Sequence, residues 1–174
     1  MKKIEEAYFA GGCFWCMEKP YHEIPGVIGA ESGYCGGSEA DARYELVKAQ
    51  KTGHRETVRV AFDPDEVSFE ELLAVYFYNI DPFDDGGQFI DRGRSYTCAI
   101  YYTDERQKSA AEEAIAKIGR ETGKTVCVAV EPFSAFYSAE EYHQNYAEKN
   151  ADAYREERIA SGREARGEEE RVKL

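Results

Sequence analysis

The segment EEAYFAGGCFWCMEKPYHEI, residues 5–24, predicts a strand, a glycine turn and a helix in that order. Residues 5–10 are expected to form the strand and residues 14–24 the helix, with a pair of glycines before it. Cys13 therefore stands where the turn meets the helix. Unpaired backbone N–H groups and the positive end of the helix dipole can lower a thiol pKa from about 8.5 to roughly 3.5 to 7.5. We predict that Cys13 is a reactive nucleophile.

Strand patterns recur later in the chain. Residues 56–63 alternate in the manner of a half-buried strand, because apolar side chains at 58, 60 and 62 would share one face. Residues 97–102 and 126–131 are also predicted to be strands.

Helix start and stop signals mark the segments between these strands. Ser68 with Glu71 forms a capping box before apolar residues that recur at offsets of three and four. Asp104 with Gln107 opens another helix, which Gly123 closes. A last helix is predicted to be capped by Ser138 and Glu141 and to bear Tyr142, His143 and Tyr146.

The interleaving of strands and helices predicts a mixed β-sheet with helices packed against it, α/β in the broad sense or α+β. The 174 residues fit one domain of ordinary size. Two long loops, residues 26–54 and 81–95, remain, and loops of that length in a compact domain are usually functional. Residues 1–154 are expected to form the catalytic domain, followed by a charged tail, residues 155–174.

Composition narrows the class of protein. The formal net charge of −12 argues against nucleic acid as a partner, because phosphate binding needs a basic face. No stretch approaches the roughly 18 apolar residues of a membrane span. The five cysteines are an odd number, and the first residues lack a secretory apolar stretch, so we expect a soluble protein in the reducing cytoplasm. The tail has almost no apolar content and is expected to be a solvated helix or partly disordered.

Cys13 and Cys16 form a C-x-x-C pair, which metal sites, redox dithiols and buried structural thiols can all produce. A thioredoxin-like thiol–disulfide exchanger would use this pair alone. A zinc-binding module would need two more ligands at a fitting spacing. The remaining candidates for such ligands are scattered along the chain: Cys35, Cys98, Cys127, His22, His54 and His143.

Two other residues are candidates for a catalytic role, one as a thiol and one as an acid. Cys35 lies within a glycine-dense segment, which could be a plain turn or could carry a mobile thiol. Glu56 follows Thr52-Gly53-His54 at the start of a predicted strand. Flanking apolar residues could raise the pKa of its carboxyl group enough for it to hold a proton near neutral pH.

Short motifs are distributed along most of the chain: Gly12-Cys13-Phe14-Trp15, Gly33-Tyr34, Tyr44, Thr52-Gly53-His54 with Glu56, Asp63-Pro64, Asp81-Pro82, Asp91 with Gly93 and Tyr96, and Tyr142-His143-Gln144 with Tyr146. They occur in the order seen in the type A peptide methionine sulfoxide reductases, and the sequence resembles this family over about residues 5–150. The resemblance implies a two-layer sandwich of the ferredoxin-like plait type. It also implies thiol-dependent reduction of methionine S-sulfoxide, free or in proteins, with no bound metal or organic cofactor.

The resemblance assigns a role to each matching position of the reaction centre. Cys13 matches the nucleophile that attacks the sulfoxide sulfur, and Glu56 matches the acid that protonates the sulfoxide oxygen. Tyr44 and Tyr96 match the hydroxyl groups that hold this oxygen. Asp91 lies in the same polar cluster of the family.

Aromatic positions of the motifs match the substrate wall. Phe14 and Trp15 match the apolar surface around the substrate methyl group, which together with the polar wall selects the S epimer at sulfur. His143 is expected to support the site structurally rather than to act as a catalyst.

The reaction would leave Cys13 as a sulfenic acid, which must condense with a second thiol before thioredoxin or another dithiol can restore it. The family often supplies this thiol from its C-terminal tail, where the present chain has no cysteine. Cys16 is the first choice for the resolving thiol and Cys35 the alternative. Cys98 and Cys127 fall in predicted strands and are expected to be buried and inert.

Overall fold

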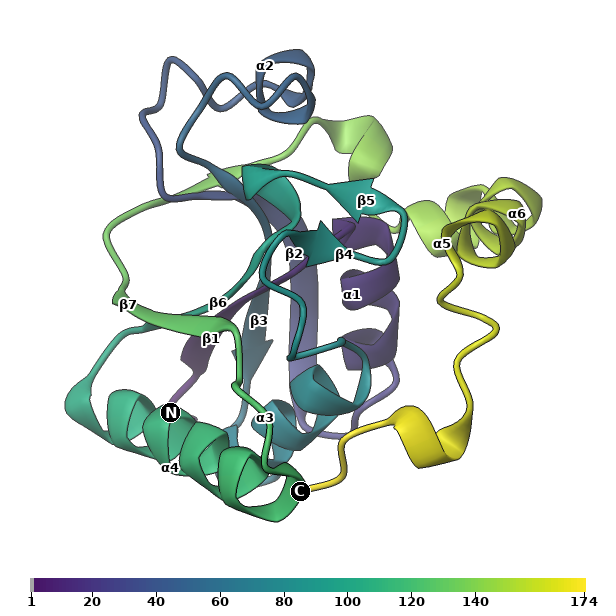
Figure 1. Cartoon of the computed structure of the whole chain (residues 1–174). Helices are drawn as coiled ribbons and strands as arrows, with labels where there is room; N and C mark the ends of the chain where they lie inside the picture. Colours follow the sequence, from purple (N-terminus) through teal and green to yellow (C-terminus); the bar gives the residue numbers. More distant parts are fainter. Residues whose placement is uncertain (1) are drawn as a thin grey trace.

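The computed structural model describes residues 2–174, which form a mixed β-sheet with helices packed against it (Figure 1). The strands of the sheet are β1 (Glu5–Gly11), β2 (Val27–Cys35), β3 (Arg55–Phe62), β6 (Cys98–Tyr102), β7 (Val128–Pro132) and β8 (Phe136–Ser138). Their order is β7-β6-β1-β3-β2-β8, with β6 and β7 parallel and the other neighbours antiparallel. A separate ribbon joins β4 (Gly87–Gln88) to β5 (Asp91–Arg92). The expected mixed α/β architecture is confirmed.

Helices α1 (Phe14–His22), α3 (Phe69–Tyr78) and α4 (Glu105–Thr122) contribute side chains to the main core on one face of the sheet. The other helices are α2 (Tyr44–Lys48), α5 (Tyr146–Lys149) and α6 (Ala151–Ser161), with the 3₁₀ helices η1 (Arg94–Tyr96), η2 (Glu141–His143) and η3 (Glu168–Glu170). No helix within residues 2–174 combines the length and apolar character needed to cross a bilayer.

The alternation of β3 decides which side chains enter this core. Val58, Val60 and Phe62 are buried on the helix-covered face, together with Phe9 of β1 and Leu72 of α3. Each such side chain contributes roughly 1.5 to 3 kcal/mol when it leaves water. The predicted inner face of the segment 56–63 is therefore confirmed.

The predicted caps hold the ends of α3 and α4. The Ser68 hydroxyl accepts a hydrogen bond from the Glu71 N–H, and the Glu71 carboxylate accepts one from the Ser68 N–H, at 3.1 and 2.7 Å. Asp104 accepts from the Gln107 N–H at 2.8 Å, and Gly123 ends α4 in the left-handed conformation. These signals act within four residues, which is why they could be read locally.

The prediction of a long loop over residues 26–54 was wrong, because this segment contains β2 and α2. β2 pairs with β3 along its length, from Val27 opposite Phe62 to Cys35 opposite Arg55. Its glycines interrupt any apolar alternation. The strand is therefore specified by backbone pairing with a partner some 25 residues away, which a local pattern does not show.

The predicted last helix was also wrong in its start. Ser138 ends β8, and its hydroxyl donates to the Glu31 carboxylate instead of capping a helix. η2 follows, and Asn145 then adopts a positive φ of 52°, so α5 begins only at Tyr146. The boundary predicted after residue 154 lies inside α6.

Candidate active site

Cys13 lies in the turn that joins the C-terminal end of β1, a central strand of the sheet, to α1. Gly12 adopts a φ of +87°, which favours glycine. Cys13 is the N-cap of α1, and its carbonyl oxygen accepts hydrogen bonds from the N–H groups of Cys16 and Met17 at 3.1 and 3.3 Å. Both cysteines of the C-x-x-C pair therefore belong to the first turn of one helix.

The two thiols are buried in one cluster. Cys13 is 8% exposed and Cys16 2%. The hydrogen bond from Cys13, assisted by the charges of Arg163 and Arg158, lowers the pKa of Cys16 to about 7. The hydrogen bond with Cys16 and burial raise the pKa of Cys13.

This distribution corrects the expectation that the helix start lowers the pKa of Cys13 itself. Two interacting thiols lose their protons in two steps that belong to the pair, the first made easier and the second harder. The pair Cys13 and Cys16 therefore loses its first proton near neutral pH, and the resulting negative charge belongs to both thiols.

Glu56 approaches the pair from the neighbouring strand. It lies on β3 opposite Tyr34, is 2% exposed, and accepts a hydrogen bond from the Phe14 N–H at 3.1 Å through Oε1. Its other oxygen, Oε2, is buried and has no hydrogen-bond partner among residues 2–174. Burial, with a smaller contribution from the charge of Asp91, raises the pKa of this carboxyl group to about 8. Glu56 is therefore protonated at neutral pH, and a proton on Oε2 would be free to be donated.

Two phenols and a second carboxyl group lie around Glu56. Tyr44 begins α2 and Tyr96 ends η1, and burial followed by the charge of Glu56 raises the pKa of both hydroxyls. They remain neutral hydrogen-bond donors. Burial also raises the pKa of Asp91 on β5, while the charge of Arg163 opposes this shift. The structure thus brings Cys13, Glu56 and these three side chains into one cluster.

An aromatic wall stands beside the thiols. Trp15 stacks on Tyr146 at 3.9 Å between ring centroids, and its indole N–H donates to Nδ1 of His143 at 3.0 Å. The His143 ring lies 5.1 Å from Phe14 and 4.3 Å from Tyr44. Because Nδ1 accepts this bond and burial lowers the pKa of His143, the imidazole is neutral and carries its proton on Nε2. His143 therefore holds the indole in place.

The C-x-x-C pair packs against Tyr154 of α6 and the Trp15–Tyr146 stack. In the part of the chain that the structure describes, no three His, Cys, Asp or Glu side chains are grouped so that they could hold a metal ion.

Residues 5–173 match the family model described as "Peptide methionine sulfoxide reductase". The chain belongs to this family. It is 49% identical over 165 residues to the peptide methionine sulfoxide reductase MsrA of Bacillus licheniformis, an alignment that covers 94% of this chain and 91% of the relative. Methionine sulfoxide reduction, the expected enzyme activity, is therefore confirmed.

Solved structures agree with the fold of this methionine sulfoxide reductase. Mxr1 from Saccharomyces cerevisiae in its reduced form superposes with a TM-score of 0.81 at 26% identity, covering 86% of this chain and 87% of the yeast chain. Mxr1 in complex with Trx2 superposes with a TM-score of 0.56 at 18% identity, covering 83% and 86%, and shows the fold alone.

The other cysteines of the reductase lie outside the buried cluster that holds the dithiol. Cys35 pairs with Arg55 at the end of β2, so its side chain is on the opposite face of the sheet from Glu56, next to Tyr101. Burial raises the pKa of Cys35 and of Cys98 to about 12. Cys127 was wrongly expected in a strand: it precedes β7 and is partly exposed, because β7 pairs with β6 only from Val128.

Sequence reasoning missed the contribution of the C-terminal segment to the reductase site. Arg163 is 3% exposed and donates to the carbonyl oxygen of Gly11 at 2.8 Å and to that of Asn79 at 3.1 Å. A Cβ atom at Gly12 would lie 2.6 Å from Nη2 of Arg163, so the guanidinium lies against the turn before Cys13. A segment with balanced charges and few apolar residues gave no local signal of this packing.

Proposed function

We propose that Cys13 reduces methionine S-sulfoxide with Glu56 as the proton donor. The observation that carries this proposal is the buried, protonated carboxyl group of Glu56, which is fastened to the backbone N–H of Phe14, the residue after Cys13. Sulfoxide oxygen departs poorly from sulfur unless it is protonated, so a thiolate that attacks the sulfur needs such an acid beside it.

The step balances with these two groups alone. The Cys13 thiolate attacks the sulfoxide sulfur and forms a bond between the two sulfurs, while Glu56 protonates the sulfoxide oxygen. The protonated oxygen then moves to the Cys13 sulfur as its bond to the substrate sulfur and the bond between the two sulfurs both break. This leaves Cys13 as a sulfenic acid, S–OH, and releases the thioether as methionine. Cys13 is oxidised by two electrons, methionine sulfoxide is reduced by two, and the ionised Glu56 regains its proton from solvent.

The wall and the phenols set the substrate's orientation in this proposal. Phe14 and Trp15 offer an apolar surface to the methyl group, while Tyr44 and Tyr96 donate hydrogen bonds to the oxygen. Asp91 completes the polar side of the pocket. Polar groups on a single wall then accept only one configuration at sulfur, because the other epimer would turn its oxygen toward the aromatic rings.

The test of this function is a single-turnover assay with the pre-reduced chain and the separate S and R epimers of dabsyl-methionine sulfoxide. We expect one equivalent of methionine from the S epimer and essentially none from the R epimer. Recovery of the S epimer unchanged, while the protein is folded and its thiols are reduced, would contradict the proposal.

We further propose that Cys16 resolves the sulfenic acid. Its thiol would attack the Cys13 sulfur, releasing water and forming a disulfide that a dithiol such as thioredoxin reduces. The burial of the two thiols in one cluster and their place in the same helical turn support this assignment. Mxr1, which in its reduced form is 26% identical to this chain, is also known in complex with Trx2, and this supports thioredoxin as the reductant. Cys35, on the opposite face of the sheet, would have to cross a strand to reach Cys13.

Cys16→Ser is expected to form one equivalent of methionine and then stop, because no disulfide can be presented to thioredoxin. The measurement is product per enzyme with and without thioredoxin, thioredoxin reductase and NADPH. Cys35→Ala is the matched control and should turn over like the parent protein. Sustained turnover in Cys16→Ser together with arrest in Cys35→Ala would transfer the resolving role to Cys35.

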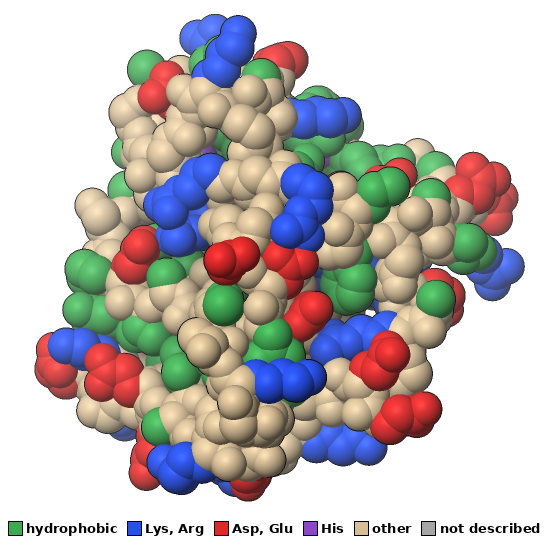
Figure 2. Space-filling view, viewed as in Figure 1, with side chains coloured by type: hydrophobic (Ala, Val, Ile, Leu, Met, Phe, Trp, Pro, Cys, Tyr) green, Lys and Arg blue, Asp and Glu red, His purple; other side chains and the backbone are tan. Residues whose placement is uncertain are grey.

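The partners that fit this function are oxidised proteins or free methionine sulfoxide, and thioredoxin. The face in Figure 2 intersperses acidic and basic side chains and has no extended basic area, consistent with the net charge of −12. We therefore propose no nucleic-acid and no membrane partner for the reductase. A cytoplasmic location agrees with five cysteines that are all free thiols.

A further inference from the structure

Arg163 is a buried cation without a carboxylate partner among the residues that the structure describes. Its guanidinium is bound by two carbonyl oxygens, those of Gly11 and Asn79, and it lies over the ring of Phe89 at 4.8 Å. Its Nε is buried and finds no acceptor within residues 2–174. Burying a charge in this way is costly, and carbonyl dipoles compensate it less well than an anion does. A negative charge nearby would therefore account for its placement.

This guanidinium binds the turn that leads into the dithiol. Arg163 binds the carbonyl group two residues before Cys13 and contacts the turn at Gly12. Its charge helps to lower the pKa of Cys16 and opposes the rise in the pKa of Cys13 and of Asp91. The arginine is thus bound to the backbone directly before the thiols.

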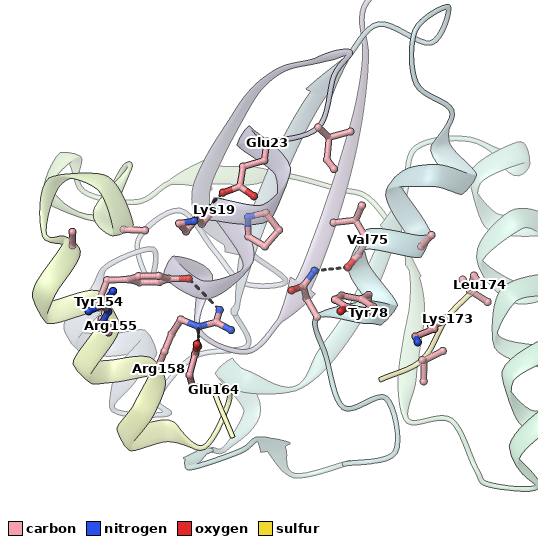
Figure 3. Close-up of a pocket in the computed structure, with 17 residues that line it drawn as sticks. Lys19, Glu23, Val75, Tyr78, Tyr154, Arg155, Arg158, Glu164, Lys173 and Leu174 are labelled. Carbon is pink, nitrogen blue, oxygen red and sulfur yellow. Dashed lines mark hydrogen bonds and ion pairs between the residues drawn. The ribbon is translucent and has the colours of Figure 1, made fainter. Parts of the chain in front are cut away.

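Arg158 supplies a second cation from the same C-terminal segment. It donates to the Tyr154 hydroxyl at 3.2 Å and to the Glu164 carboxylate at 2.9 Å, and Figure 3 shows its guanidinium between these two groups. Tyr154 packs directly against Cys13 and Cys16. Because Glu164 neutralises part of its charge, Arg158 should act on the thiols more weakly than Arg163.

The two carboxyl groups near the pair disfavour an anion there. Glu56 from β3 and Asp91 from β5 would repel a thiolate when they are ionised. The hydroxyls of Tyr44, Tyr96 and Tyr154 also interact with the pair and stay neutral, because burial raises their pKa. The whole chain adds a net charge of −12. The positive charges of Arg163 and Arg158 therefore offset the acidic groups around the thiols.

We propose that Arg163, with a smaller contribution from Arg158, is a positioning residue that stabilises the thiolate shared by Cys13 and Cys16. The segment after α5 thereby supplies the positive charge that the active site needs to hold a thiolate. This inference rests on the proposed redox role of the pair. It assigns to the C-terminal segment, which has no cysteine, the task of keeping the thiols ionised at neutral pH.

The test is the pH dependence of iodoacetamide alkylation of the reduced full chain, quantified at the Cys13 and Cys16 peptides by mass spectrometry. Arg163→Gln should move the alkylation midpoint up by about one pH unit, the size expected for losing an adjacent opposite charge. Arg158→Gln should move it up by less. Arg163→Lys, which keeps the charge, should restore most of the shift.

Arg166→Gln is the matched control. Arg166 also fastens the C-terminal segment to the core, through the carbonyl oxygen of Ile80, and lies over Phe89 at 5.9 Å, but it is not among the charges that act most strongly on the thiols. The pH midpoint of thiol alkylation in Arg166→Gln should equal that of the parent protein.

An unchanged midpoint in folded Arg163→Gln, or an equal shift in Arg166→Gln, would overturn the inference. Should Arg163→Gln not fold, Arg158→Gln decides, and an unchanged midpoint in that variant counts against the proposal. Alkylation uses no sulfoxide, so it tests the role of Arg163 separately from the proposed function. A failure of the proposed function would appear instead as S epimer that is not reduced.

Discussion

Cys13→Ser is expected to form no methionine, even in the first turnover with stoichiometric enzyme. A serine hydroxyl is neither ionised near neutral pH nor able to take up the oxygen as a sulfenic acid, so the chemical step is lost outright. The remaining thiol, Cys16, is only 2% exposed, so it is less accessible to the substrate than Cys13 at 8%. The measurement is conversion of the S epimer by pre-reduced protein after removal of the reductant.

The control for this variant is Cys127→Ser, which removes a partly exposed thiol far from the dithiol in the structure. It should convert the S epimer at the parent rate. Both proteins should show the same far-ultraviolet circular dichroism. Product from Cys13→Ser at the level of one equivalent would show that another thiol attacks the substrate and would end the assignment.

Glu56→Gln is expected to slow the first turnover by roughly 10² to 10⁴, the usual contribution of general acid catalysis. The amide oxygen can still accept the Phe14 N–H bond, so the variant removes the proton with little change in shape. Glu31→Gln is the matched control: Glu31 pairs with Arg59 across β2 and β3, on the sheet face away from Glu56. An unaltered rate in Glu56→Gln would remove the acid role.

The pH profile separates loss of the acid from damage to the fold. The parent rate should rise as the dithiol ionises near pH 7 and fall as Glu56 loses its proton near pH 8. Glu56→Gln should keep the rise and lose the fall. Because the folded-state pKa of Glu56 is above its ordinary value of 4.5, its protonated form stabilises the fold below pH 4.5, and this contribution disappears as the pH rises through 8. The melting temperature of the parent should therefore drop more between pH 5 and 9 than that of Glu56→Gln.

Short-range features of the fold were open to prediction from sequence. The capping box at Ser68, the left-handed stop at Gly123 and the alternation of residues 56–63 all appear in the structure as expected. Each depends on hydrogen bonds within a few residues or on one buried face. β2 was missed because its glycine-rich residues are held by the edge of β3, and the start of α5 because Asn145 interrupts the helical turn.

The sequence by itself indicated Cys13 and Glu56, and its resemblance to a known family added Tyr44 and Tyr96; the structure gathers these four positions around one helix start. Tertiary structure alone decided their protonation. A pKa depends on exclusion of water and on charges across space, so burial makes Glu56 an acid, and the thiol of Cys16 lies where it can share the charge of Cys13. Folding also decided the place of Arg163 beside these residues. Nothing in the sequence around Arg163 indicates that it binds the carbonyl oxygens of Gly11 and Asn79.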